Sequence, residues 1–175
     1  MMNRTHFRAV RVNLLWQIAL AVVYITMVLF CASFIAQSVA VWAVVVGSLS
    51  SSACSVFAIP SSVAANPRKI IGGYVIGLSV GLLVHFMIAM LSIHMDKLSV
   101  HPHFFWIFAS IGVGLTMTIM ALTGLEHPPA VGAAIVLVLN VEGDHVFWMI
   151  LLFALALAGI RKVLGNKLKD LVDNS

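Results

Sequence analysis

Long apolar runs separated by short polar connections make up almost the whole chain. Six runs can be drawn, at about Leu14–Gln37, Val39–Pro60, Ile70–Ile93, Phe104–Leu122, Pro129–Leu139 and Val146–Val163. A helix that crosses a bilayer needs about 20 apolar residues, because each residue advances it by about 1.5 Å. The pattern therefore predicts an all-α membrane protein with about six transmembrane segments, of which the fifth is long enough for only about half a crossing.

The second and fifth runs are irregular. Serines interrupt the second run at Ser48, Ser50, Ser51 and Ser52, and the fifth run is short and follows two prolines. These runs are the middle members of the two halves of the chain. Because each half has an odd number of spans, the second half would be inverted relative to the first. Interrupted segments at matching positions indicate a transporter's binding site, so we expect a 3+3 inverted repeat with irregular or half-length second and fifth segments.

The basic residues predict the orientation of the chain. Nine of the ten precede the first run, connect the second to the third or follow the sixth: Arg4, Arg8, Arg11, Arg68, Lys69, Arg161, Lys162, Lys167 and Lys169. The tenth, Lys97, lies beside Asp96 in the connection after the third run. Six crossings place the nine on one side, whereas four would put Arg68 on the side of the acidic connection that holds Glu142. Because basic loops stay in the cytoplasm, we expect cytoplasmic tails at about 1–13 and 161–175, in a bacterial inner membrane.

A single polytopic domain accounts for residues 1–175, because no hydrophilic stretch is long enough for a second one. The 175 residues are 62% hydrophobic and 9% charged, whereas soluble domains carry about 25% charged residues. The net charge of +4 comes from the ends and the connections, which does not make the continuous basic stripe of a nucleic-acid interface. The first run lacks an A-x-A-like end, so it is typical of a retained span rather than a cleaved signal peptide.

Neither a metal nor a cofactor is expected. Cys31 and Cys54 lie inside apolar runs without a CxxC partner, so we expect two small buried thiols. His94, His101 and His103 cluster near one connection, but their irregular spacing is weak support for a metal site.

The stretch TGLEHPPA places polar groups between two apolar runs. Proline lacks an N–H and fits the first turn of a helix, so these prolines would open the short fifth helix. A helix that begins inside the membrane presents free N–H groups and partial positive charge, which suit an anion. We expect an anion to bind at Thr123, His127, Pro128, Pro129 and Ala130, together with the hydroxyls of Ser50, Ser51 and Ser52.

Three further residues are candidates for the pathway or for proton coupling: His85, Glu126 and Arg68. Glu126 would orient or neutralise His127, unless the stretch is a tight cytoplasmic turn in which both side chains are solvated. His85 lies in an apolar run, where an ionisable residue suggests function, although a neutral histidine bonded between helices is the alternative. Arg68 would attract anions at the inner mouth, or else set the topology and contact lipid headgroups.

Gly73, Gly77 and Gly81 recur every four residues in the third run and lie on one helix face. Such a face lets the backbone of a neighbouring helix approach closely. The neighbour would belong to the same subunit or to a second copy, so a homo-oligomer through this face is one expectation.

The stretch TGLEHPPA resembles the signature of the HPP family of integral membrane proteins, which is named for His-Pro-Pro. A second block of the family reads roughly G-S-x-G-A-S, then P-x-S-x-x-x-x-P-R-N-x-x-G-G-H. This chain resembles it at Gly47-Ser48, Ser52-Ala53, Pro60, Ser62, Asn66-Pro67-Arg68 and Ile71-Gly72-Gly73. It departs from the pattern at Lys69, which replaces Asn, and at Tyr74, which replaces His.

The resemblance implies a small polytopic protein, usually with about four spans, whereas the apolar runs give six. It also implies a link to nitrite transport, with which plant and cyanobacterial relatives are associated. We expect a transporter or channel for a small inorganic, nitrite-like anion. The alternatives are a non-transporting membrane subunit or scaffold, and a membrane hydrolase that uses Glu126, His127 and His85. The chain has no HExxH pattern, and no acid–histidine set in it has a recognisable catalytic spacing, so we expect no enzyme.

Overall fold

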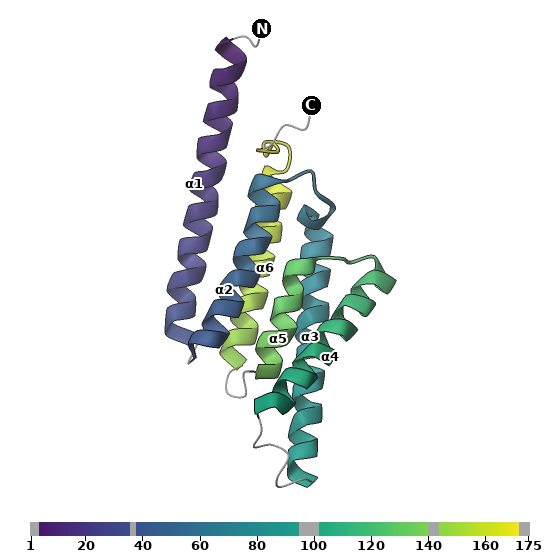
Figure 1. Cartoon of the computed structure of the whole chain (residues 1–175). Helices are drawn as coiled ribbons and strands as arrows, with labels where there is room; N and C mark the ends of the chain where they lie inside the picture. Colours follow the sequence, from purple (N-terminus) through teal and green to yellow (C-terminus); the bar gives the residue numbers. More distant parts are fainter. Residues whose placement is uncertain (1–3, 36–37, 95–101, 140–143, 172–175) are drawn as a thin grey trace.

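The computed structural model describes residues 4–35, 38–94, 102–139 and 144–171 (Figure 1). The helices are α1 (Arg4–Ile35), α2 (Val39–Ala58), α3 (Pro67–His94), α4 (Pro102–Thr123), α5 (Val131–Leu139) and α6 (Asp144–Leu164). Two short 3-10 helices, η1 (Val63–Ala65) and η3 (Pro128–Ala130), precede α3 and α5. No strand occurs within the described ranges, so the predicted all-α class is confirmed.

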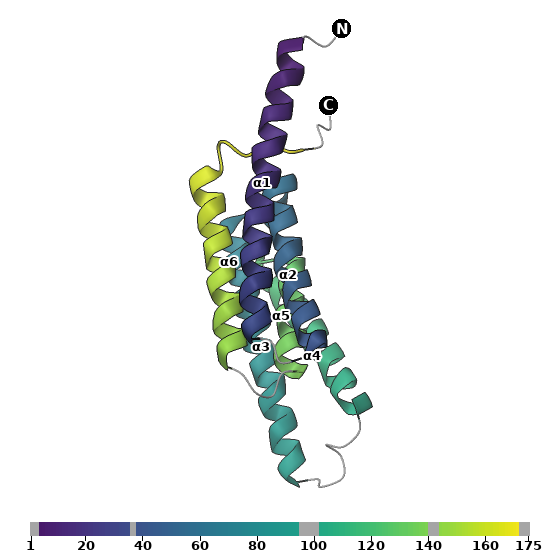
Figure 2. The same cartoon turned by 90° about the vertical axis from the view of Figure 1, so that its left-hand side faces the viewer.

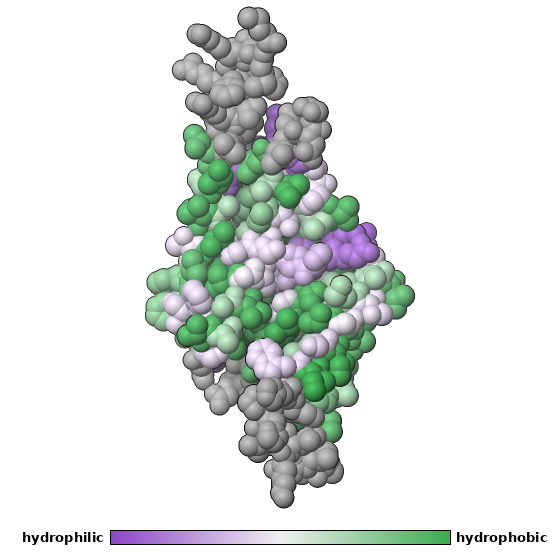
Figure 3. Space-filling view, in the orientation of Figure 1, coloured by the Kyte–Doolittle hydropathy of each residue, from purple (hydrophilic) through white to green (hydrophobic). Residues whose placement is uncertain are grey.

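Five helices are long and apolar enough to cross a membrane: Leu15–Phe34, Val39–Ala58, Pro67–Leu91, Phe105–Thr123 and His145–Leu164. Their outer faces carry large exposed apolar side chains such as Phe34, Leu122 and Val163. Figure 3 shows hydrophobic residues over much of the described surface, with a hydrophilic patch near the level of the α4–α5 connection. Such a surface is stable only in a bilayer, and the molecule is an all-α membrane protein.

The helices run alternately up and down, so the start of α1 and the end of α6 lie at one end of the bundle (Figures 1 and 2). The fifth segment is formed by η3 and α5 together, and this apolar stretch, Pro128–Leu139, is shorter than a full span. Figure 1 shows that α5 begins well below the upper ends of α2 and α6. The expected half-length fifth segment is therefore confirmed.

The expected irregularity of the second segment is wrong, because α2 is one continuous helix of 20 residues. Its serines fit the helix because their hydroxyls bond to carbonyls one turn back. Ser55 donates to the carbonyl of Ser51 at 3.1 Å, and Oγ of Ser52 lies 3.2 Å from the carbonyl oxygen of Ser48. Cys54 of the same helix is exposed rather than buried, so one of the two thiols faces outward.

The packed helix pairs agree with a 3+3 inverted repeat. If α1, α2 and α3 correspond to α4, α5 and α6, the α1–α2 contact matches α4–α5, α1–α6 matches α3–α4, and α2–α6 matches α3–α5. The α3–α6 and α2–α5 contacts map onto themselves. Helix directions are opposite in the two halves (Figure 1). The repeat itself stays a prediction that superposition of the halves would test.

The short helix α5 lies inside the bundle and packs against α2, α3 and α4. It packs against α3 along the row of Gly73, Gly77 and Gly81. A Cβ at Gly77 would lie 2.5 Å from the carbonyl oxygen of Ala130, and one at Gly81 would lie 2.9 Å from that of Ala134. The row is thus occupied within the subunit and is not free for a second copy. A homo-oligomer, which stays a prediction, would need another surface.

Candidate functional site

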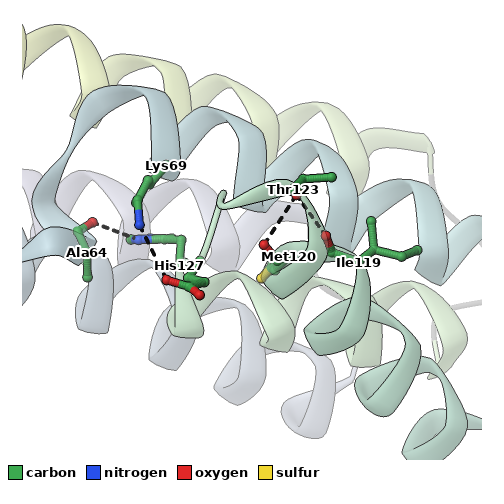
Figure 4. Close-up of polar contacts among 7 residues, drawn as sticks. Ala64, Lys69, Ile119, Met120, Thr123 and His127 are labelled. Atoms are coloured by element: carbon green, nitrogen blue, oxygen red, sulfur yellow. Dashed lines mark hydrogen bonds and ion pairs between the residues drawn. The ribbon is translucent and has the colours of Figure 1, made fainter.

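The stretch TGLEHPPA forms a turn that brings the chain back into the bundle (Figure 4). At the end of α4, Gly124 adopts a φ of 66°, and the N–H of Leu125 bonds to the carbonyl of Met120 at 3.0 Å. This arrangement closes the helix in the way that a left-handed glycine permits. The Leu125 side chain then packs against Gly72 of α3, where a Cβ would come within 2.7 Å of it. The turn therefore delivers His127 to the inside of the bundle.

The two prolines open η3, as predicted, with His127 as the residue before the first turn. The N–H of Ala130 bonds to the carbonyl of His127 at 3.0 Å, and the N–H of Val131 bonds to the carbonyls of Pro128 and Pro129. These two donors are consequently occupied within the turn. The predicted role of free N–H groups directly after Pro129 is not what the structure shows, because a 3-10 turn satisfies them.

His127 is fully buried, and both of its ring nitrogens are hydrogen-bonded. Nδ1 lies 2.9 Å from the carbonyl oxygen of Ala64, and Nε2 lies 2.8 Å from Oγ of Ser52. A carbonyl can only accept, so we assign the proton of the neutral ring to Nδ1. Nε2 then accepts from the Ser52 hydroxyl. His127 lies outside the five apolar spans. Burial lowers its pKa to about 4, against an opposing effect of the Ala64 carbonyl, so the ring is neutral at pH 7.

The hydroxyl of Tyr74 extends this arrangement to a second serine. It lies 2.8 Å from Oγ of Ser52 and 3.1 Å from Oγ of Ser48. Ser48 in turn donates to the carbonyl of Pro129 at 2.6 Å. We call Ser48, Ser52, Tyr74 and His127 the serine–tyrosine–histidine network. Its members come from α2, α3 and the α4–η3 connection, and each is buried.

Only part of the predicted serine cluster belongs to the network. Ser52 faces it, but Ser51 is exposed and Ser50 is half-buried, because successive residues of a helix point about 100° apart. Thr123 is also exposed and bonds to the carbonyl of Ile119 in its own helix at 2.7 Å (Figure 4). Ser52 and His127 are thus the predicted side chains that the fold brings together.

Glu126 forms an ion pair with Lys69, with 3.4 Å between Oε2 and Nζ. Its side chain is 58% exposed and that of Lys69 is 19% exposed. The expected orientation of His127 by Glu126 is therefore not found, since Ser52 and Ala64 occupy both ring nitrogens. Arg68 is exposed at the start of α3, beside this ion pair in the sequence.

His85 lies apart from the network. It is 11 residues beyond Tyr74 on α3, which corresponds to about 16 Å along a helix axis. Its ring is half-buried and packs against that of Phe86, with 6.2 Å between centroids. Nδ1 of His85 is buried without a hydrogen-bond partner within the described part of the chain. A coupling role for His85 would therefore require proton transfer between His85 and the separate serine–tyrosine–histidine network.

Two network residues were missed as site residues, although the sequence held a signal for each. Ser48 lies four residues before Ser52 and therefore on the same helix face. Tyr74 directly follows Gly73 and occupies the position where the family pattern has His. The tyrosine ring packs beside His127, with 5.6 Å between the centroids.

Comparison with protein families decides the assignment. A family model described as "HPP, transmembrane region" matches residues 7–168. The chain belongs to the HPP family. The resemblance inferred from TGLEHPPA is confirmed, and together with the five apolar helices it identifies an integral membrane protein. No curated protein and no solved structure matches the chain.

Proposed function

We propose that this HPP-family protein carries a small inorganic, nitrite-like anion across the membrane, and that the serine–tyrosine–histidine network is its binding site. One observation carries the proposal. Three hydroxyls and an imidazole converge inside an apolar bundle, at the start of its half-length helix, and none of the four side chains is a carboxylate. Buried polar groups in a membrane protein mark substrate pathways by default.

The charges near the network favour a negative ligand. Glu126, the acidic neighbour of His127 in sequence, is paired with Lys69. Arg68 adds a further positive charge at the same end of α3. A basic entrance that leads to an interior without carboxylates concentrates anions rather than cations.

The hydrogen-bond polarity of the network suggests that the anion enters together with a proton. While His127 is neutral, the Ser52 hydroxyl donates to Nε2 and cannot donate to a ligand. When His127 gains a proton, Nε2 becomes a donor to Ser52, and the hydroxyl hydrogen of Ser52 is released. Without an anion that hydrogen reaches the carbonyl of Ser48 at 3.2 Å. A bound anion would compete for it.

The proposal extends to location and orientation. We infer a bacterial inner membrane, with both termini and the α2–α3 connection in the cytoplasm. The end of the bundle at which α3 begins and α6 ends holds Arg68, Lys69, Arg161 and Lys162, and basic residues favour the cytoplasmic side. The site would then lie towards the cytoplasmic end.

A hydrolase is the second candidate, because Ser52 Oγ and His127 Nε2 are 2.8 Å apart, as a nucleophile and its base would be. Against it, Nδ1 is held by a backbone carbonyl rather than a carboxylate, and Ser52 is fully buried. We therefore propose that the protein is not an enzyme. A fluorophosphonate probe that labels Ser52 in the folded protein would support the hydrolase instead.

The test of transport is anion flux into proteoliposomes. Nitrite, nitrate, formate, chloride and sulfate would be compared for the wild type and for His127→Ala at two pH values. We expect selective uptake of a small monovalent anion, faster at the lower pH, and loss of that uptake in His127→Ala at equal expression. Absence of flux for every anion, from protein shown to be folded, would leave the scaffold or the hydrolase.

A further inference from the structure

The segment after α6 folds back across the end of the bundle. We call Lys167–Leu171 the strap. Gln17 of α1 is fully buried and holds the strap by two bonds, accepting from the N–H of Lys169 at 3.1 Å and donating to its carbonyl at 2.8 Å. The same amide donates to the carbonyl of Phe57 at 2.7 Å. The N–H of Leu171 bonds to the carbonyl of Ala58 at 2.9 Å. The strap is thus anchored to α1 and α2.

The strap also contacts the connection between α2 and α3. We call Ile59–Asn66 the cover loop. Asp170 of the strap accepts from the N–H of Ser61 at 2.9 Å and from its hydroxyl. These bonds to Ser61 lower the pKa of Asp170. From α6, the guanidinium of Arg161 donates to the carbonyl of Pro60 at 2.7 Å. One end of the cover loop is therefore held by the strap and by the last turn of α6.

The other end of the cover loop closes the serine–tyrosine–histidine network. The carbonyl of Ala64 accepts from Nδ1 of His127, and Ala65 is fully buried. Network and strap therefore bind the same eight-residue loop at different positions, the strap at Ser61 and the network at Ala64. The loop bonds internally through short turns, such as Ala65 N–H to the carbonyl of Ser62 at 3.0 Å. The Ser62 hydroxyl is buried without a partner in the described structure, so this side chain adds no anchor.

The contact between strap and loop is the exposed part of this arrangement. Gln17 is buried, but both hydrogen bonds between Ser61 and Asp170 are exposed to solvent. Hydrogen bonds and charges in water exchange readily with solvent, whereas buried ones are costly to leave unpaired. The pair between Ser61 and Asp170 is consequently the first that thermal motion would open.

We propose that the strap is a latch that holds the cover loop closed over the network, and that its release opens the network to water from this end. The role of such a latch in controlling transport rests on the function proposed above. The opening of the network does not depend on that function, because it is a property of the fold that can be measured without anion flux.

The test uses the full chain in membranes, with Cys31→Ala, Cys54→Ala and Ser52→Cys as the background. A thiol at position 52 is buried while the loop is closed, so a water-soluble maleimide should react with it slowly. Asp170→Asn removes the charge that Ser61 binds, and Gln17→Leu removes the buried anchor of the strap. Lys167→Gln is the matched control, because it changes a charge on the same strap at an exposed side chain.

We expect Asp170→Asn and Gln17→Leu to raise the labelling rate several-fold, and Lys167→Gln to leave it unchanged. Equal rates in all three variants, from protein that elutes as a single folded species, would overturn the latch. Faster labelling together with no anion flux in the parent protein would support the latch and reject the transport proposal. Selective anion flux together with equal labelling rates would support the transport proposal and reject the latch.

Discussion

Oγ of Ser52 lies 2.8 Å from Nε2 of His127, although 75 positions separate the two residues in the sequence. The contact joins the continuous helix α2 to the turn that starts the half-length helix. Both side chains are fully buried, so neither can exchange this partner for water in the closed structure. The pair therefore links the fold of the HPP turn to the chemistry proposed for it.

Replacing the serine tests the structural value of this contact. Ser52→Ala leaves Nε2 of His127 and the Tyr74 hydroxyl short of a partner, which we expect to cost about 1–3 kcal/mol of unfolding free energy. Ser51→Ala is the matched control on the next residue, which is exposed, and should change it by less than about 0.5 kcal/mol. Thermal unfolding in detergent measures both. Similar effects for the two variants would contradict the network.

Tyr74 offers a separate test of the same network. Tyr74→Phe keeps the ring against His127 but removes the hydroxyl that reaches Ser48 and Ser52. We expect a loss of about 1–3 kcal/mol of unfolding free energy, with slower anion flux if the network is the site. Tyr74→His restores a polar ring at this position and should recover part of the flux. Full flux in Tyr74→Phe would remove the tyrosine from the binding site.

The space around two glycines predicts opposite changes in stability when each is replaced by alanine. A Cβ at Gly77 would lie 2.5 Å from the backbone oxygen of Ala130, so Gly77→Ala must push η3 and the start of α5 away and should destabilise the fold by about 1–3 kcal/mol. Gly114 of α4 has nothing within 4 Å of its Cβ position. Gly114→Ala should therefore stabilise its helix by up to about 1 kcal/mol. Unfolding temperatures of the two variants, measured side by side, check this contrast.

Acid should weaken the fold through His127. An unfolded histidine binds a proton below its ordinary pKa of about 6.5, whereas burial holds the pKa of His127 in the folded chain at about 4. The neutral imidazole therefore contributes to the free energy of unfolding above about pH 6.5, and this contribution is lost as the pH falls towards 4. We expect the unfolding temperature of the wild type to drop over this window and that of His127→Asn to drop less. Parallel curves for the two proteins would contradict a neutral buried imidazole.

The helices were predictable because their signals are local. Apolar runs and the length of Pro129–Leu139 predict where spans lie and which one is short, and the two prolines mark where the fifth helix begins. Which serine faces the site is a matter of helix rotation relative to α3 and α5. The sequence does not state that rotation, and so Ser51 was included and Ser48 was not.

The remaining misses come from contacts between distant segments. Glu126 was assigned to His127, its neighbour in sequence, but the fold places Lys69 of α3 beside it. Gln17 lies in the first apolar run, and its amide donates to the carbonyls of Lys169 in the strap and of Phe57 in α2. Such pairings follow from where whole elements pack, and no periodicity along the chain encodes them.

The most direct measurement is nitrite uptake by proteoliposomes that contain the wild type, Ser52→Ala or Ser51→Ala at equal folded content. The account predicts that Ser51→Ala transports like the wild type, that Ser52→Ala transports far more slowly, and that protons enter with the anion. Equal uptake in Ser51→Ala and Ser52→Ala would contradict the assignment of the anion to the serine–tyrosine–histidine network.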